Sequence, residues 1–160
     1  MSSAPPTISP RLWMVAAVTG CGAFIAMLDS TVANLAIDAI SREFGAPLED
    51  AQWVATSYLV ALALSLPLSA WLSRRFGSRR VWVAALLTFV AASIWCALSR
   101  DMATLTVARC LQGLSAGLMV PTGQAILSEA ANRQQLGRLM GTVGFAVALG
   151  PALGPGLGGV

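Results

Sequence analysis

Two charged side chains, Asp29 and Arg109, lie inside apolar segments (about 12–37 and 103–127) that contain no other charge. If these segments cross a membrane, each charge costs at least ~2.5 kcal/mol unless it is paired or hydrated. Arginine stays protonated, whereas a carboxylate gains or loses a proton as its pairing and hydration change. The two residues together therefore suit reversible proton binding. The alternative is a static ion pair that fixes helix packing.

The depths of the two charges can be compared along their helices. Asp29 precedes Ile37 by eight residues, and Arg109 follows Ala103 by six. At helical rise these intervals are about 12 Å and about 9 Å from the same end. We therefore expect a pair if the two helices are neighbours. Gln112 follows Arg109 by one turn on the same face, where it can orient the guanidinium.

Three further polar residues within the apolar segments are candidates for a substrate pathway: Asn34, Thr31 and Gln124. Each can instead make a helix-packing hydrogen bond. The chain contains no histidine, so a proton carrier within a membrane must be a carboxylate. No nucleophile–base or metal-ligand spacing is present, so we expect neither an enzyme nor a bound cofactor.

The elements that position these residues are apolar helices. The chain is 56% hydrophobic and 11% charged, with a mean hydropathy of +0.73, against roughly 25% charged residues in soluble domains. The fold class predicted is an all-α membrane protein with five transmembrane helices. Their expected ranges are about 12–37, 51–72, 81–98, 103–127 and 137–160.

Charge placement predicts the orientation. With the N-terminus inside, seven arginines face the cytoplasm and only Arg42 and Arg100 face outward. This positive-inside bias predicts a multi-pass protein with a cytoplasmic N-terminal tail over residues 1–11, expected to be disordered. It also attributes the basic pI of about 9.2 to membrane orientation, so no nucleic-acid partner is expected. The lipid bilayer is the expected surrounding.

Glycine recurs at every fourth position near the end of the chain, with proline beside it. The residues are Gly150, Pro151, Gly154, Pro155, Gly158 and Gly159. Proline and glycine weaken a helix in water, but a membrane-embedded backbone must satisfy its own hydrogen bonds. A smooth stripe of small residues then allows a neighbouring helix to pack closely. Because the chain stops within this pattern, we expect a fragment of a longer protein.

A short arginine-rich link joins the second and third predicted helices. Gly77 permits a tight turn, and Arg75, Arg79 and Arg80 lie around it. These side chains can interact with helix ends, nearby carboxylates or anionic lipid headgroups. Alone, the link indicates topology only.

The order of motifs resembles the N-terminal part of the major facilitator superfamily, and most closely its fourteen-span drug:proton antiporter branch. The resemblance extends from about Leu12 to the end of the chain. The motifs that carry it are Leu28-Asp29-Ser30-Thr31-Val32-Ala33-Asn34-Leu35-Ala36, Gln52-Trp53-Val54-Ala55-Thr56-Ser57-Tyr58-Leu59, Leu66-Pro67-Leu68, Arg109-Cys110-Leu111-Gln112-Gly113 with Gly117, and Gly150-Pro151 through Gly158-Gly159. Three positions depart from the family pattern: Ala70 replaces a glycine, Arg74 an acidic residue, and Asp38 a proline.

The resemblance implies a bacterial inner-membrane transporter that exports hydrophobic or cationic drug-like molecules in exchange for protons, by alternating access. The proton gradient would be its coupling ion, with Asp29 as the proton-linked carboxylate, Arg109 as its relay partner and Gln112 in support. The glycine–proline stripe would be the antiporter motif, and the arginine link a gating loop. The missing C-terminal half would be required for transport, and a periplasmic adaptor protein is a further implied partner.

Three other functions compete with export of drugs. A transporter of the same fold can carry another small solute, but the glycine–proline stripe and the first-helix motif argue against this. A small oligomeric channel would need a repeated polar lining, which these segments lack. A non-transporting membrane scaffold is the third alternative.

Overall fold

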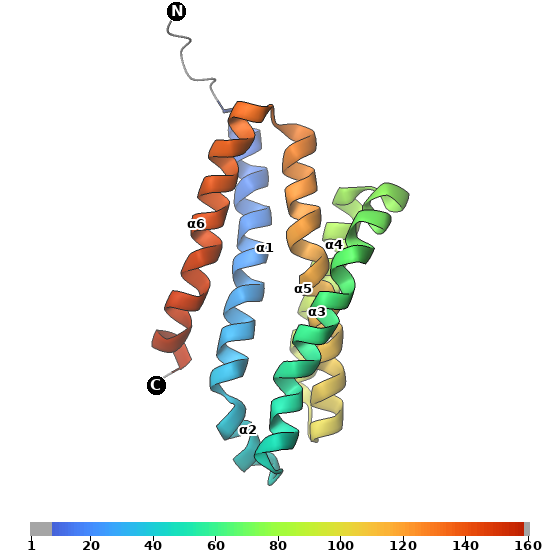
Figure 1. Cartoon of the computed structure of the whole chain (residues 1–160), viewed down its shortest axis with the longest axis vertical. Helices are drawn as coiled ribbons and strands as arrows, with labels where there is room; N and C mark the ends of the chain where they lie inside the picture. The colour runs from blue at the N-terminus through green and yellow to red at the C-terminus, as the bar shows by residue number, and fades with distance from the viewer. Residues whose placement is uncertain (1–7, 159–160) are drawn as a thin grey trace, which may run out of the picture.

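The computed structural model describes residues 8–158, and for residues 146 and 149–158 it describes the backbone alone. Within this range the regular structure is entirely helical. The helices are α1 (Pro10–Leu35), α2 (Ile37–Phe44), α3 (Leu48–Phe76), α4 (Ser78–Leu98), α5 (Met102–Ala130) and α6 (Arg133–Gly158). The five long helices run side by side, and α2 lies at the end of the bundle opposite the start of α1 (Figure 1).

Four of the described helices are long and apolar enough to cross a membrane: α1, α3, α4 and α5. The predicted all-α membrane fold is therefore confirmed, with four of the five predicted spans. The fifth predicted segment, 137–160, overlaps α6, which is helical through Gly158. Gly159 lies outside the described residues.

The first predicted span differs from the structure at both ends. Helix α1 begins at Pro10, because the Ser9 hydroxyl accepts a hydrogen bond from the Leu12 N–H at 3.3 Å and proline suits the first helical position. Two residues assigned to the tail are therefore helical. At the other end the helix is interrupted at Ala36, and the chain continues as the short helix α2, which is capped by Gly45 with φ 59°.

Helix α5 occupies the centre of the bundle and packs against α3, α4 and α1, while α6 packs against α1 (Figure 1). Its start is capped by Asp101, whose carboxylate accepts the Thr104 N–H at 2.8 Å. This hydrogen bond holds the pKa of the Asp101 carboxyl below its ordinary value. The cap therefore stabilises the helix above the ordinary pKa, and this contribution is lost as pH falls through the lowered one.

Glycines set the closest helix approach. A Cβ on Gly113 would lie 2.2 Å from the backbone oxygen of Tyr58, and one on Gly117 would lie 2.5 Å from that of Leu62. Helices α3 and α5 thus touch backbone to backbone, as small residues four apart allow in membrane helices. The contact fixes how residues on these two helices face each other.

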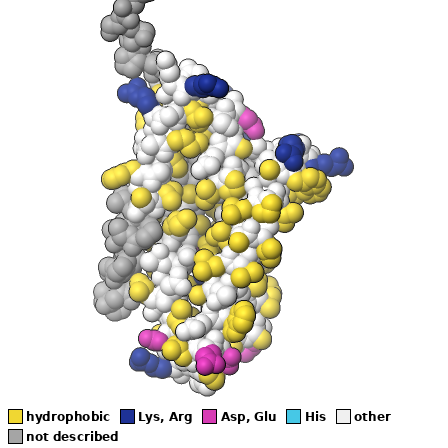
Figure 2. All heavy atoms as spheres, viewed as in Figure 1, with side chains coloured by type: hydrophobic (Ala, Val, Ile, Leu, Met, Phe, Trp, Pro, Cys, Tyr) yellow, Lys and Arg dark blue, Asp and Glu magenta, His cyan; other side chains and the backbone are white. Residues whose placement is uncertain are grey.

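Many alanines line the interior beside larger residues such as Trp82 and Phe89. Many other large apolar side chains are exposed, including Leu64, Leu87 and Leu98. Figure 2 shows these hydrophobic side chains spread over the surface of the helices, with charged side chains gathered at the two ends. Arginines of the α3–α4 turn lie at the end that also holds the start of α1, and acidic side chains cluster at the other end. An apolar girdle between charged ends is the surface expected of a membrane-embedded bundle.

The α3–α4 turn is tied to the far end of α5. Gly77 adopts φ 86°, which glycine tolerates best. The buried Ser78 hydroxyl then donates a hydrogen bond to the Glu129 carboxylate at 2.8 Å. This contact joins residues 51 positions apart at the arginine-rich end of the bundle.

We expect Ser78→Ala to lower the free energy of unfolding by about 1–2 kcal/mol, because a hydrogen bond to a charged acceptor is lost. Thermal melting in detergent measures the change. Ser128→Ala is the matched control, since that exposed hydroxyl bonds only within its own helix, to the Ala125 carbonyl. Equal melting temperatures for the two variants would show that the Ser78–Glu129 hydrogen bond does not stabilise the bundle.

Candidate functional site

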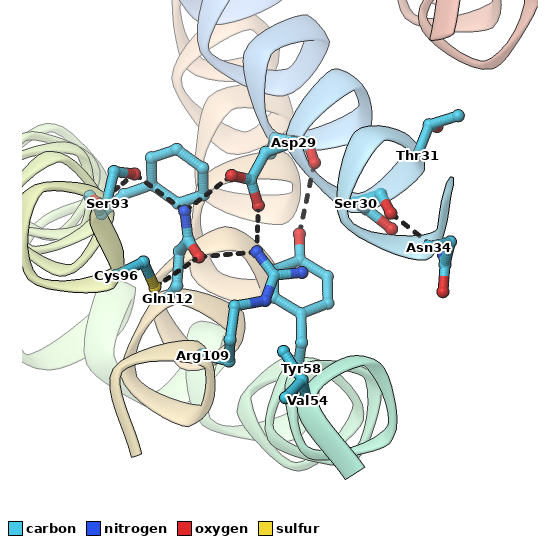
Figure 3. A network of polar contacts seen from close by, with 12 residues as sticks. Asp29, Ser30, Thr31, Asn34, Val54, Tyr58, Ser93, Cys96, Arg109 and Gln112 are labelled. Carbon is cyan, nitrogen blue, oxygen red and sulfur yellow. Dashed lines mark hydrogen bonds and ion pairs between the residues drawn. The ribbon is translucent and has the colours of Figure 1, made fainter. Parts of the chain in front are cut away.

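Side chains from four helices meet at one level inside the bundle (Figure 3). Helix α1 supplies Asp29, α3 supplies Tyr58, and α5 supplies Arg109 and Gln112. Helix α4 adds Ser93 and Cys96. The α3–α5 glycine contact lies next to this cluster, since Gly113 directly follows Gln112 and approaches the backbone of Tyr58. The backbone packing therefore positions the polar groups.

The ion pair predicted from helix depth is present. Arg109 Nη1 lies 2.5 Å from Asp29 Oδ2, and the same nitrogen donates to Gln112 Oε1 at 2.7 Å. Gln112 Nε2 donates to the other carboxylate oxygen, Asp29 Oδ1, at 2.8 Å. Both oxygens of the carboxylate are therefore engaged. Gln112 contacts both the arginine and the aspartate, whereas the sequence predicted only a contact with the arginine.

Gln112 is itself held by α4. Its Nε2 donates to Ser93 Oγ at 2.7 Å, and the Cys96 thiol donates to its Oε1 at 3.6 Å. With only 1% of its surface exposed, Gln112 has little freedom to rotate. A rigid amide of this kind fixes which face of the carboxylate is closed by protein.

The ring of Tyr58 closes the site on the side of α3. The Arg109 guanidinium carbon lies 4.4 Å from the centroid of the Tyr58 ring, within cation–π distance. The Tyr58 hydroxyl donates to the Ala26 carbonyl of α1 at 3.3 Å, which anchors the ring between two helices. The ring therefore offers Arg109 a contact that does not depend on the charge of Asp29.

Burial is uneven across the pair. The Arg109 side chain is 5% exposed, whereas that of Asp29 is 26% exposed. Among the described residues the buried Arg109 Nε has no hydrogen-bond partner. The arginine is thus enclosed and fixed, while the carboxylate is open on one side. Of the two charged groups, Asp29 is therefore the more accessible to solvent.

The predicted substrate-pathway residues do not join this cluster. Thr31 donates to the Met27 carbonyl and Asn34 donates to the Ser30 carbonyl, both at 2.9 Å within α1. Figure 3 shows both side chains farther along α1, away from the ion pair. Gln124 is exposed and lines a cavity of about 120 Å³ between α1, α5 and α6. Their place in a substrate pathway stays a prediction.

The remaining predicted residues lie at the ends of the helices. Arg75, Arg79 and Arg80 are exposed around the turn at Gly77. The backbone of the antiporter motif is helical through Gly158, but Gly159 and the side chains of this stretch lie outside the described residues. The gating and antiporter assignments therefore stay predictions.

Sequence reasoning missed Tyr58, Ser93 and Cys96 as members of the site. A usable signal existed for Tyr58, which is the one tyrosine of the chain and lies within a charge-free span. Ser93 and Cys96 gave no such signal, because small polar residues in membrane helices usually bond to their own backbone. Only the packing of α4 against α5 places these two beside Gln112.

We expect Tyr58→Leu to cost more stability when Asp29 is already neutral. In an Asp29→Asn background the ring becomes a main partner of the Arg109 charge, and a desolvated cation–π contact is worth up to about 2 kcal/mol. A double-mutant cycle of melting measurements tests this coupling. Tyr58→Phe, which keeps the ring, is the control and should show little coupling. If the stability effects of Tyr58→Leu and Asp29→Asn simply add, the ring does not contact the Arg109 charge.

Comparison with known proteins agrees with the family resemblance that the motifs indicate. The sequence profile of the Major Facilitator Superfamily matches residues 19–160. A "Multidrug resistance protein B homolog" of Mycobacterium tuberculosis is 34% identical over 157 residues, which is 98% of this chain and 29% of that protein. A "Putative multidrug resistance protein MdtD" of Salmonella typhi is 35% identical over 160 residues, which is 100% of this chain and 33% of that protein. The chain thus spans about a third of the length of these curated relatives.

The family match covers the charged pair, the amide that bridges it and the glycines that bring α3 and α5 together. It agrees with the apolar helices and with the resemblance that the motifs indicated. The chain belongs to the Major Facilitator Superfamily.

Proposed function

We propose that the intact protein exports drug-like molecules in exchange for protons, by alternating access. The observation that carries the proposal is the partly open carboxylate of Asp29 beside the enclosed charge of Arg109. The printed names of the relatives, which refer to multidrug resistance, support the same cargo class. Hydrophobic or cationic molecules are the proposed substrates, because a carboxylate in an apolar surrounding attracts a cation.

Asp29 would alternate between two states. Ionised, it pairs with Arg109 and accepts the Gln112 amide. Once protonated, it no longer attracts the guanidinium, whose charge then rests against the Tyr58 ring and the Gln112 carbonyl oxygen. Because Arg109 keeps these partners, protonation weakens the link between α1 and α5 without leaving a bare buried charge. A change in that link is a means of coupling proton binding to helix movement.

The remaining parts of the proposal concern the whole protein. Transporters of this kind place their site between two halves, so we propose that this chain requires the C-terminal part and does not transport alone. The protein would lie in the bacterial inner membrane with a cytoplasmic N-terminus. The arginine link would act at the cytoplasmic gate, and the glycine–proline stripe would limit leakage between the halves. A periplasmic adaptor is a further proposed partner.

Everted membrane vesicles containing the intact protein test this function. Acidifying the vesicle interior should drive uptake of a fluorescent lipophilic cation, and nigericin, which collapses the pH gradient, should abolish it. Uptake that persists after nigericin but disappears when the membrane potential is collapsed would exclude electroneutral proton exchange. Vesicles without the protein are the control.

A further inference from the structure

An apolar groove opens on the outside of the bundle, away from the ion pair. Its volume is about 490 Å³, within the roughly 300–1,000 Å³ of small-molecule sites. It runs between the second half of α3, the first half of α4 and the middle of α5. Residues that define its walls are Leu72, Phe76, Val81, Ala84, Thr88 and Leu118.

The groove ends at positive charge. Arg80 lines its rim, and Arg74, Arg75 and Arg79 lie exposed on the same turn. Within residues 8–158 none of these four guanidinium groups forms an ion pair. The nearby carboxylate of Glu129 accepts the Ser78 hydroxyl. One carboxylate offsets at most one of four guanidinium charges, so the turn presents net positive charge beside an apolar channel.

Aromatic residues mark the depth of this end in a membrane. The exposed Trp71 packs edge-on against Phe76, with ring centroids 6.3 Å apart. Tryptophan prefers the headgroup level of a bilayer. From Arg80 to Thr88 the groove follows eight residues of α4, which is about 12 Å of helix directed towards the bilayer centre. Charge at headgroup level with an apolar channel beneath it matches the shape of a phospholipid.

We propose that this groove binds one anionic phospholipid, with an acyl chain between α3, α4 and α5 and the phosphate at Arg80. Charge complementarity favours an anionic lipid over a zwitterionic one, since the turn carries four arginines. It also favours a lipid over a further helix of the intact protein, because an apolar helix would leave those arginines without a partner. The site is independent of proton coupling, and its test needs no transport assay.

Native mass spectrometry of the intact protein, titrated with phosphatidylglycerol, tests the site. Arg80→Gln should weaken binding about fivefold, the effect of one basic residue at an anionic surface. Ala84→Trp should weaken binding at least as much. Ala84 is exposed and lines the groove, so an indole at this position fills the space for the acyl chain. The matched controls are Arg42→Gln at the opposite end and Val83→Trp, an exposed position of α4 outside the groove. Both should bind like the parent, and phosphatidylcholine should bind more weakly.

Three results would overturn the proposal. Arg80→Gln and Arg42→Gln could weaken binding equally, which would indicate a general charge effect. Inorganic phosphate at millimolar concentration could displace the lipid, which would indicate an anion site without a bound chain. Ala84→Trp could lower the melting temperature while lipid binding stays unchanged, which would show that another part of the protein fills the groove.

Discussion

Gly113→Ala should strongly lower the stability of the helix bundle, because all three atoms nearest to the new Cβ belong to the Tyr58 backbone. The new Cβ would lie 2.2 Å from the Tyr58 backbone oxygen and 2.9 Å from its Cα. Alanine gains about 1 kcal/mol of helix propensity over glycine, but overpacking costs about 1–3 kcal/mol and more where the obstacle is backbone. The steric term therefore wins, and we expect a net loss of roughly 2 kcal/mol, read as a lower melting temperature in detergent.

Gly141→Ala is the matched control, because a Cβ there meets no atom within 4 Å. It should melt at or slightly above the temperature of the parent. Gly113→Ala should also disturb transport, since the displaced residue, Tyr58, carries the ring that contacts Arg109. If the two alanine variants melted alike, the close α3–α5 approach would not exist.

Arg109→Gln should be nearly as damaging, for an electrostatic reason. Removing one member of a buried pair costs about 3–5 kcal/mol, because the remaining charge has no partner. Since the Asp29 side chain is 26% exposed, water relieves part of this cost, and we expect about 3 kcal/mol. Thermal melting and the yield of folded protein measure the effect.

Adding Asp29→Asn to that variant should restore much of the stability, because the double variant buries no unpaired charge. It should not restore proton-driven transport. Arg100→Gln, an exposed arginine at the same end of α5, is the control and should leave both properties unchanged. A double variant less stable than Arg109→Gln alone would contradict an energetic link between the two charges.

The pairing of Asp29 with Arg109 was predictable because each charge is isolated in an apolar segment, and helical rise gives its depth. The presence and order of the long helices were predictable because a bilayer demands long apolar runs, but their ends differ from the predicted ranges by up to four residues, as in α3, which is Leu48–Phe76 against a predicted 51–72. The break at Ala36 was not, because α2 is short and its sequence continues the helical pattern. The Ser78–Glu129 bond was also unpredictable, since it joins residues 51 positions apart.

Side chains from four helices set the surroundings of one carboxylate, that of Asp29. Helix α1 carries Asp29, the proposed proton-binding group, while α3, α4 and α5 supply the ring, the hydroxyl and the amide that fix its surroundings. A motif of residues on α5 alone therefore does not define the site. Its chemistry arises from the glycine-mediated contact of α3 and α5, which brings Tyr58 over Arg109.

Proton release on substrate binding tests the central claim most directly. The intact protein, purified in a weakly buffered detergent solution, is mixed with tetraphenylphosphonium, and a pH indicator reports released protons. If Asp29 exchanges a proton for a cation, the parent should release protons. Asp29→Asn should release none, while Asp38→Asn, an exposed carboxylate outside the cluster, should behave like the parent. Equal proton release from the parent and from folded Asp29→Asn would show that Asp29 is not the coupling carboxylate.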